Sequence, residues 1–406
     1  MRARADTRSL VALFAATGAE LCGLFLFAPL LLFQLQARGL DGAATGLFAA
    51  LNWAGVLLGA PFAGAAVRRL GTARALLLSG AVPALALAGI QLGQALPLWA
   101  LLNLVAGVAA ALRWVLSEAL VARLAPPAHR GRVMGLFATM VGGTFMAGPA
   151  LASALLARGA TPAQAGWVAV ALAAAGVLLL LGVRVPELAA APPGRAAQAA
   201  GTGLARALSG ARALGRTLRA APVVMASGCV GGFFEAGLSG ALPLWGVSLG
   251  WSTAAAALLV TLSGLGSTLA AAPAGELADR WGHQRLRRGC LVLCLGGALL
   301  LPAVALPGAD WLAWPLAAAW GAAGSALYTL AMVEIGRRHA GDDPAGGSGQ
   351  ALVDSTGVLV LAYTAGSMVA PPLAGLMIDH APRHGLAALL AAVALAGLWA
   401  LRTRHG

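Results

Sequence analysis

The sequence predicts an all-α integral membrane protein with twelve transmembrane helices arranged as two pseudo-symmetric six-helix lobes. Three observations support this fold class. Of the 406 residues, 60% are hydrophobic and only 10% are charged, whereas a soluble domain carries about 25% charged residues. Twelve apolar runs are long enough to cross a bilayer, which takes about 20 residues. One long polar break divides these runs into two sets of six.

Each apolar run is predicted to be a helix, because a bilayer offers no water to satisfy backbone N–H and C=O groups. The runs are too continuous for the strands of a membrane barrel, which need about 10 alternating residues. The first run extends to Phe33, too far for the core of a signal peptide, so we expect it to be a retained span. The predicted spans are residues 9–36, 42–67, 73–94, 96–122, 132–157, 162–184, 222–248, 252–278, 286–306, 310–334, 350–378 and 384–401.

The arginines predict the orientation. All 27 basic residues are arginines, and an even number of spans puts both termini on one side. The segments on that side hold 23 arginines, and those on the other side hold Arg38, Arg158 and Arg383. Because cytoplasmic loops are enriched in basic residues, both termini are predicted to be cytoplasmic. The arginines lack the interleaved aromatic side chains of a base-stacking surface, so nucleic acid is not an expected partner.

The polar break divides the chain into an N-terminal lobe at 1–185, a basic cytoplasmic linker at 186–221 and a C-terminal lobe at 222–406. The two lobes repeat weakly at an offset of 211 residues, and such parallel repeats are typical of transporters with a site between their lobes. The repeated pairs are Gly39 and Gly250, Gly64 and Gly275, Arg69 and Arg280, Gly71 and Gly282, and Arg74 and Arg285.

The stretch "GELADRWGHQR" carries a family resemblance. It matches the loop between the second and third helices of a lobe in the major facilitator superfamily, at Gly275, Leu277, Ala278, Asp279, Arg280, Gly282 and Arg285. The stretches "LRWVLSEALVARLAPPAHRGRVMG" and "GTFMAGPALA" also resemble bacterial efflux permeases of this superfamily. The resemblance implies alternating access between two rocking lobes, a bacterial cytoplasmic (inner) membrane, and a monomer.

The resemblance also implies that each loop packs under the opposite lobe, with its aspartate at the N-terminal end of a helix, where the helix dipole attracts a carboxylate. For Asp279 this is the start of the fifth span, near Arg130. In the first loop Arg68 replaces the aspartate. We therefore predict a reversed pair of Arg68 with Asp354, or with the acids at 342–343, as a cytoplasmic gate. The alternative is that Arg68 is only a topology signal.

Small residues in the fifth span resemble a motif of antiporters in this superfamily. The match is partial, because Thr144 stands where a further glycine is expected. Two interpretations stay open, a role specific to antiport and close helix packing by small residues. The motif residues are Gly142, Gly143, Gly148 and Pro149.

Two charges in the first lobe are predicted to meet in the membrane. A charge at mid-membrane costs about 2.5 to 3.5 kcal/mol, which demands a reason. Glu20 lies near the middle of the first span and Arg113 near the middle of the fourth. Burial disfavours the charged carboxylate and a neighbouring arginine favours it, so the contact would load and release a proton. The alternative is a static ion pair that joins two helices.

Three further residues complete the candidate set. Glu235 lies in the seventh span, one helical turn beyond the repeat position of Glu20, so we expect both to face one central cavity. Tyr328 lies about where the repeat would put Arg113, one helical turn further on, and is a candidate lining residue. Glu118 is about 140° around the helix from Arg113, and we favour a gating or packing contact for it over a cavity role.

These features favour a secondary transporter. An enzyme is not expected, because all six histidines lie in loops or the tail without metal-ligand spacing. We assign no chemistry to the four cysteines and expect neither a metal nor a cofactor, because the proton gradient would drive transport. The expected partners are a small-molecule substrate, protons and the lipid bilayer. Proton-coupled efflux of a small apolar or cationic compound is the leading function. The alternative is a proton-coupled symporter for a small organic anion or another polar metabolite, with Arg113 binding the anion.

Overall fold

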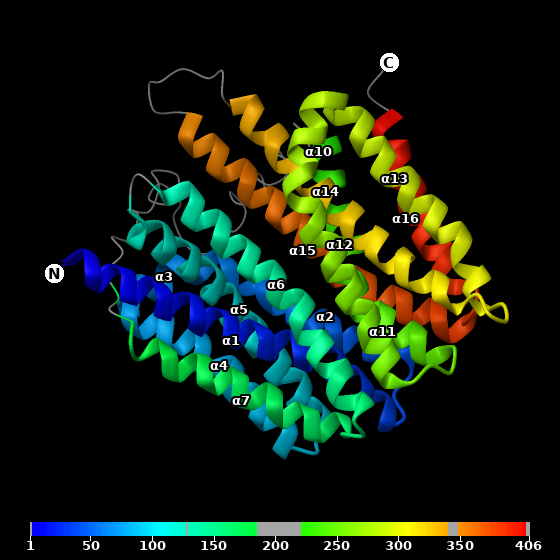
Figure 1. Cartoon of the computed structure of the whole chain (residues 1–406), viewed down its shortest axis with the longest axis horizontal. Helices are drawn as coiled ribbons and strands as arrows, with labels where there is room; N and C mark the ends of the chain where they lie inside the picture. Colours follow the sequence, from blue (N-terminus) through cyan, green and yellow to red (C-terminus); the bar gives the residue numbers. More distant parts are fainter. Residues whose placement is uncertain (1, 127–128, 184, 186–220, 340–347, 403–406) are drawn as a thin grey trace, which may run out of the picture.

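The computed structural model describes residues 2–126, 129–183, 185, 221–339 and 348–402, and this part of the chain folds into helices joined by turns, without a strand. Twelve of its helical segments are long and apolar enough to cross a membrane. Their limits fall within a few residues of the predicted spans. The prediction of an all-α protein with twelve spans in two lobes is confirmed, and Figure 1 shows the lobes side by side.

The first lobe runs from blue to green in Figure 1 and the second from green to red. The helices of the first lobe are α1 (Arg2–Ala37), α2 (Gly42–Gly59), η1 (Ala60–Phe62), α3 (Ala63–Leu70), α4 (Thr72–Leu92), α5 (Leu96–Leu124), α6 (Arg130–Ala157) and α7 (Pro162–Leu180). Those of the second lobe are α10 (Pro222–Gly232), η3 (Phe233–Gly237), α11 (Leu238–Ser248), α12 (Thr253–Trp281), α13 (His283–Leu300), η4 (Leu301–Ala305), η5 (Asp310–Leu312), α14 (Ala313–His339), α15 (Ser348–His380) and α16 (Gly385–Arg402).

The turns explain the repeat of 211 residues. Gly39 and Gly250 have φ values of 84°, and Gly71 and Gly282 have φ values of 77° and 88°. Glycine adopts such left-handed conformations without steric cost, so it ends the preceding helix at the same place in each lobe. Two of the five repeated pairs therefore mark helix ends.

The lobes pack together along one half of their length only. We call the end of the bundle that carries Arg2 and Arg402 the termini face, and the opposite end the distal face. In the distal half, Leu32 of α1 belongs to the apolar cluster of the second lobe, and Ala256 and Ala257 of α12 belong to a cluster of the first. In the half near the termini face there are two described apolar clusters, and each contains residues of a single lobe, one of the first and one of the second. The assignment of the termini face to the cytoplasm rests on the arginines and stays a prediction.

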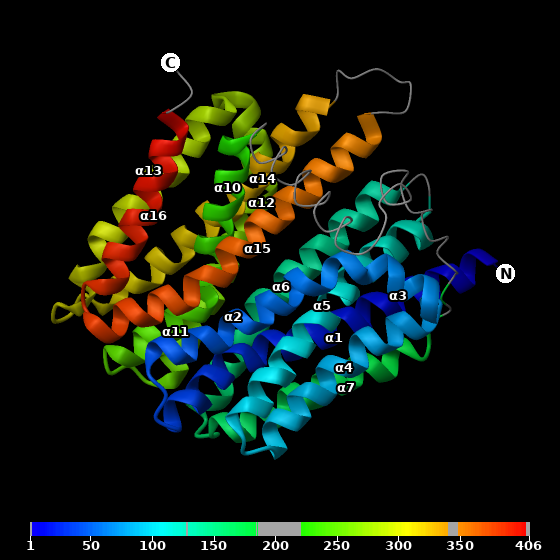
Figure 2. The same cartoon turned by 180° about the vertical axis from the view of Figure 1, so that it is seen from behind.

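Two pairs of helices form most of the contact between the lobes, α6 with α12 and α2 with α15, and α11 adds smaller contacts with α1 and α2. Figure 2 shows α2 beside α15. A Cβ atom built on Gly264 of α12 would lie 3.1 Å from the carbonyl oxygen of Phe145 on α6. A Cβ atom on Gly46 of α2 would lie 2.2 Å from the carbonyl oxygen of Pro371 on α15. Glycine thus allows the backbones of the two lobes to touch.

Candidate functional site

Glu20 and Arg113 form an ion pair inside the first lobe. Nη2 of Arg113 on α5 lies 2.8 Å from Oε2 of Glu20 on α1 and 3.5 Å from Oγ1 of Thr17. The side chain of Arg113 is 3% exposed and that of Glu20 is 0% exposed. The predicted contact is confirmed, whereas its role in proton coupling stays a prediction.

Glu20 does not face the space between the lobes, so the prediction that it shares a cavity with Glu235 is wrong. A Cβ atom on Gly80 of α4 would lie 3.1 Å from Oε2 of Glu20, and one on Gly176 of α7 would lie 2.9 Å from its Cβ atom. The carboxylate is therefore buried against helices of its own lobe. A helix that is apolar all round has no polar stripe to show where a charge points.

Glu235 lies in the second lobe, in the single turn of π-helix that η3 forms between α10 and α11. Its carboxylate accepts hydrogen bonds from Oγ of Ser267 on α12 and from the hydroxyl of Tyr363 on α15, at 3.0 Å. Ser325 on α14 is a further donor. Turns of π-helix are frequent at functional positions. Four segments of the lobe thus converge on the carboxylate of this partly buried residue.

Both tyrosines of the chain lie beside this carboxylate. The rings of Tyr328 and Tyr363 are 4.8 Å apart at an interplanar angle of 59°. The sequence predicted Tyr328 as a lining residue but missed Tyr363, Ser267 and Ser325. The rarity of tyrosine, two in 406 residues, was a signal that could have found Tyr363. The two serines gave no signal, because small residues are common throughout these spans.

Glu118 faces the opposite way from Arg113 on α5, as the predicted separation around the helix requires. It is exposed, and its Oε1 atom accepts a hydrogen bond from Nε1 of Trp114 at 2.8 Å. Among the described residues Glu118 has no hydrogen bond or ion pair with another helix, and the gating or packing contact favoured for it stays a prediction.

The glycine motif in α6 serves close packing at two of its positions. A Cβ atom on Gly148 would lie 2.7 Å from the backbone nitrogen of Leu26 on α1, and one on Gly142 would lie 3.2 Å from Oγ1 of Thr268 on α12. Gly143 has no atom within 4 Å of such a position. Pro149 is buried within α6, which stays helical through it.

The signature loop does not contact the other lobe in this arrangement. Asp279 is exposed, and no hydrogen bond or ion pair joins it to the described residues, Arg130 included. Arg280 pairs with Glu276 on its own helix, and Gly282 ends α12. A Cβ atom on Gly275 would have no atom within 4 Å, and no hydrogen bond or ion pair joins Arg285 to the described residues of the first lobe. The predicted contact with the start of α6 is absent because the lobes are apart at the termini face.

The predicted gate on the other loop is beyond the described region. Arg68 and Arg69 are exposed at the end of α3. The side chain of Asp354 and the acids at 342–343 lie outside the described residues. The reversed charge pair therefore stays a prediction.

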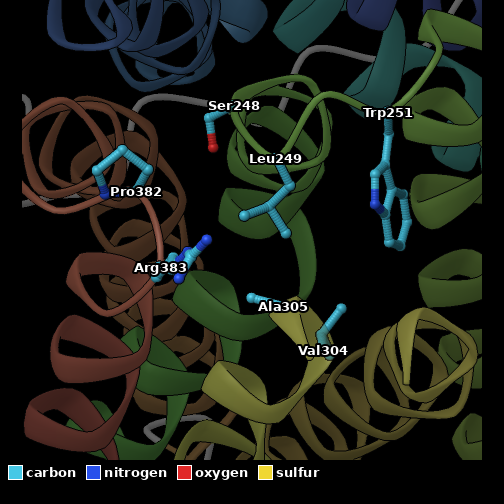
Figure 3. Close-up of a pocket in the computed structure, with 7 residues that line it drawn as sticks. All are labelled: Ser248, Leu249, Trp251, Val304, Ala305, Pro382 and Arg383. Carbon is cyan, nitrogen blue, oxygen red and sulfur yellow. The ribbon is translucent and has the colours of Figure 1, made fainter. Parts of the chain in front are cut away.

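A pocket opens at the distal face of the second lobe, far along the helices from Glu235. Figure 3 shows its lining, which comes from the turns after α11 and α15 and from η4. The lining residues are Ser248, Leu249, Trp251, Val304, Ala305, Pro382 and Arg383. None of these is a predicted site residue. Within the described residues, no three His, Cys, Asp or Glu side chains are grouped to hold a metal ion.

Solved structures share this fold. The nucleoside transporter NupG superposes with a TM-score of 0.74 at 14% identity, covering 98% of this chain and 100% of that one. A D-xylose-proton symporter gives 0.69 at 16% identity, covering 97% of each chain. A bacterial homologue of the human lysosomal transporter Spinster, in an inward-facing and unoccupied conformation, gives 0.71 at 15% identity, with 98% and 95% covered. At these identities the likeness shows the fold alone.

Sequence relatives agree with the fold. The uncharacterized MFS-type transporter YcaD of Shigella flexneri is 26% identical, over 89% of this chain and 86% of that protein. The uncharacterized MFS-type transporter YfkF of Bacillus subtilis is 25% identical, over 67% of this chain and 65% of that protein. The family model of the Major Facilitator Superfamily matches residues 13–353, which run from α1 to the first residues of α15 and include the signature loop. The chain therefore belongs to the major facilitator superfamily.

Proposed function

We propose that this chain exports a small apolar or cationic compound in exchange for protons. As a member of its superfamily the chain is a multi-pass membrane transporter and not an enzyme. The proposal therefore concerns direction, coupling and substrate. The observation that carries it is the setting of Glu235, a mid-span carboxylate whose hydrogen-bond donors among the described residues are hydroxyl groups.

A carboxylate in this setting needs a positive partner. Hydroxyl groups stabilise it by hydrogen bonds but do not neutralise it, and a bare charge in the bilayer is costly. A proton and a cationic group of a substrate both remove the net charge, and they exclude one another at one carboxylate. That competition is the minimal chemistry of antiport. The neighbouring, mutually tilted rings of Tyr328 and Tyr363 add aromatic faces that attract cations.

The pair of Glu20 and Arg113 is proposed to couple a proton to movement within the first lobe. Its complete burial separates it from the substrate, so it acts through the packing of α1 against α5. The same burial weighs against uptake of an organic anion, because that alternative needs an accessible Arg113, and its side chain is 3% exposed. We further propose a cytoplasmic membrane location with both termini inside, and a monomer.

The test uses inverted membrane vesicles that contain the chain and are acidified by respiration. Tetraphenylphosphonium serves as the cationic probe, and a pH-sensitive dye reports the protons inside the vesicles. Antiport predicts that the probe releases protons, and symport predicts no release. In Glu235→Gln vesicles we expect release to fall at least about tenfold, as expected when a partly buried charged contact is lost.

The matched control is Glu334→Gln, a carboxylate of the same lobe that pairs with Arg338 on its own helix. It should release protons as the parent chain does. Equal release from the Glu235→Gln and parent vesicles would contradict the role of Glu235. Failure of several cations and uncharged apolar probes to release protons would contradict efflux by antiport.

A further inference from the structure

A carboxylate of the second lobe caps a helix of the first at the distal face. Oδ1 of Asp379, near the end of α15, accepts a hydrogen bond from the backbone N–H of Gly42 at 2.8 Å. Oδ2 accepts one from the N–H of Ala43, also at 2.8 Å. These are the first two residues of α2. A single side chain thus bridges the lobes with both of its oxygens.

The contact suits a carboxylate chemically. The first N–H groups of a helix have no partner within the helix, and the helix dipole makes this end positive. The first lobe supplies its own cap as well, because Asp41 accepts from the N–H of Ala44 at 2.7 Å. Asp379 therefore takes the two N–H groups that Asp41 leaves unpaired.

The surrounding backbone fits this contact closely. A Cβ atom on Gly42 would lie 2.7 Å from Oδ1 of Asp379, and one on Gly375 would lie 1.9 Å from the carbonyl oxygen of Gly42. Arg383, four residues after Asp379, lines the pocket of Figure 3 instead of pairing with this carboxylate. Asp379 consequently keeps its charge available for the N–H groups of α2.

The repeat offers no second copy of the contact. The counterpart of Gly42 under the offset of 211 is Thr253, the first residue of α12, and α12 packs against α6. The counterpart of α15 in the first lobe is α6, the fifth span of that lobe. Its last residue is Ala157, and Arg158 follows it. A positive side chain cannot accept from helix N–H groups. The contact therefore holds only the seam between α2 and α15.

We propose that Asp379 and the N-terminus of α2 form a latch that holds the distal face closed and must open in each transport cycle. The latch belongs to the closed arrangement alone, because its donor and acceptor are on different lobes. Removing it shifts the population of the chain towards molecules whose distal face is open.

The experiment measures distances between the lobes by electron spin resonance, without any ligand. The four native cysteines are replaced by alanine, and spin labels are attached at Ala95→Cys and Pro307→Cys, which are exposed distal turns of the two lobes. In nanodiscs, Asp379→Asn should raise the ratio of long to short distances at least about tenfold, which is the low end for a hydrogen bond to a charged group. Ala43→Pro removes one donor in the first turn of α2, where proline is tolerated, and should act in the same direction.

Three outcomes decide the proposal. The double variant Asp379→Asn/Ala43→Pro should shift the ratio no further than the larger single effect, because both changes remove one interaction. Asp41→Ala removes a cap within the first lobe, and Asp310→Asn removes an exposed distal carboxylate, so both should keep the parent ratio. Parent-like distances in both Asp379→Asn and Ala43→Pro, or an equal shift in Asp310→Asn, would overturn the latch.

Discussion

At the scale of single residues, the two mid-span carboxylates have opposite surroundings. Glu20 has a guanidinium partner and no exposure, whereas Glu235 has hydroxyl donors and partial exposure. Glu20 is thereby suited to a switch inside one lobe, and Glu235 to contact with a transported molecule. The transporter would divide proton binding and substrate binding between its lobes.

Breaking the buried ion pair from either side should give unequal losses of stability. In Glu20→Gln the guanidinium stays charged and unpaired, which costs about 3–5 kcal/mol of stability. Arg113→Gln should cost less, because a carboxyl group removes its charge by binding a proton. The double variant should recover most of the loss. Thermal unfolding in detergent measures these effects.

The same variants separate the two interpretations of the pair. If the pair couples protons, Glu20→Gln and the double variant both lose proton-driven transport although the double variant is stable. Transport that survives in the stable double variant would show that the pair is a static joint between α1 and α5.

The charges were easy to find in the sequence, but their directions were not. Glu20, Arg113 and Glu235 stand out because each interrupts an apolar run. The burial of Glu20 depends on the space left by Gly80 and Gly176, two glycines among the 55 of the chain. Asp379 was missed because it follows a predicted span directly, where an acidic residue looks like part of an ordinary loop.

At the scale of helices, glycine sets how closely the elements approach. The helices α2 and α5 cross at Gly55 and Gly107, and a Cβ atom on Gly107 would lie 2.1 Å from the carbonyl oxygen of Asn52. Asn103 donates from Nδ2 to the carbonyl oxygen of Phe48 at the same crossing. The sequence predicted both spans within a few residues, but spacing alone does not show which glycine meets a neighbour.

A large side chain at this crossing should separate the two helices. We expect Gly107→Leu to lower stability by about 3 kcal/mol or to prevent folding, because overpacking forces the backbone to move. The yield of folded protein and its unfolding temperature measure the effect. The control is Gly131→Leu in α6, where no atom lies within 4 Å of the new Cβ atom, and a similar loss there would contradict the explanation.

At the scale of the whole molecule, the lobes touch in the distal half and part towards the termini face. This arrangement leaves Asp279 exposed, and it explains why the contact that the family resemblance implies between Asp279 and the start of α6 is not formed. A sequence specifies every state of a transporter cycle, so it predicts contacts that belong to different states. The structure shows the contacts of one state.

The orientation in the membrane follows from labelling at the two faces. In a chain without native cysteines, a membrane-impermeant maleimide should label Arg69→Cys in inverted vesicles and Arg158→Cys in right-side-out vesicles. Both side chains are exposed, at opposite faces. The reverse pattern would contradict the cytoplasmic assignment of the termini.

The two seams between the lobes differ in what holds them. Between α2 and α15 the lobes share a charged contact at the extreme distal end. Between α6 and α12 the contact reaches towards mid-height through Gly264 and Gly142 and rests on packing. Packed surfaces tolerate small rotations, whereas a hydrogen bond is either made or broken. We therefore expect the α6–α12 seam to act as the hinge. The opening motion would start at the α2–α15 seam, on the opposite edge of the molecule. The entrance would then form beside α2 and α15 before the lobes separate fully.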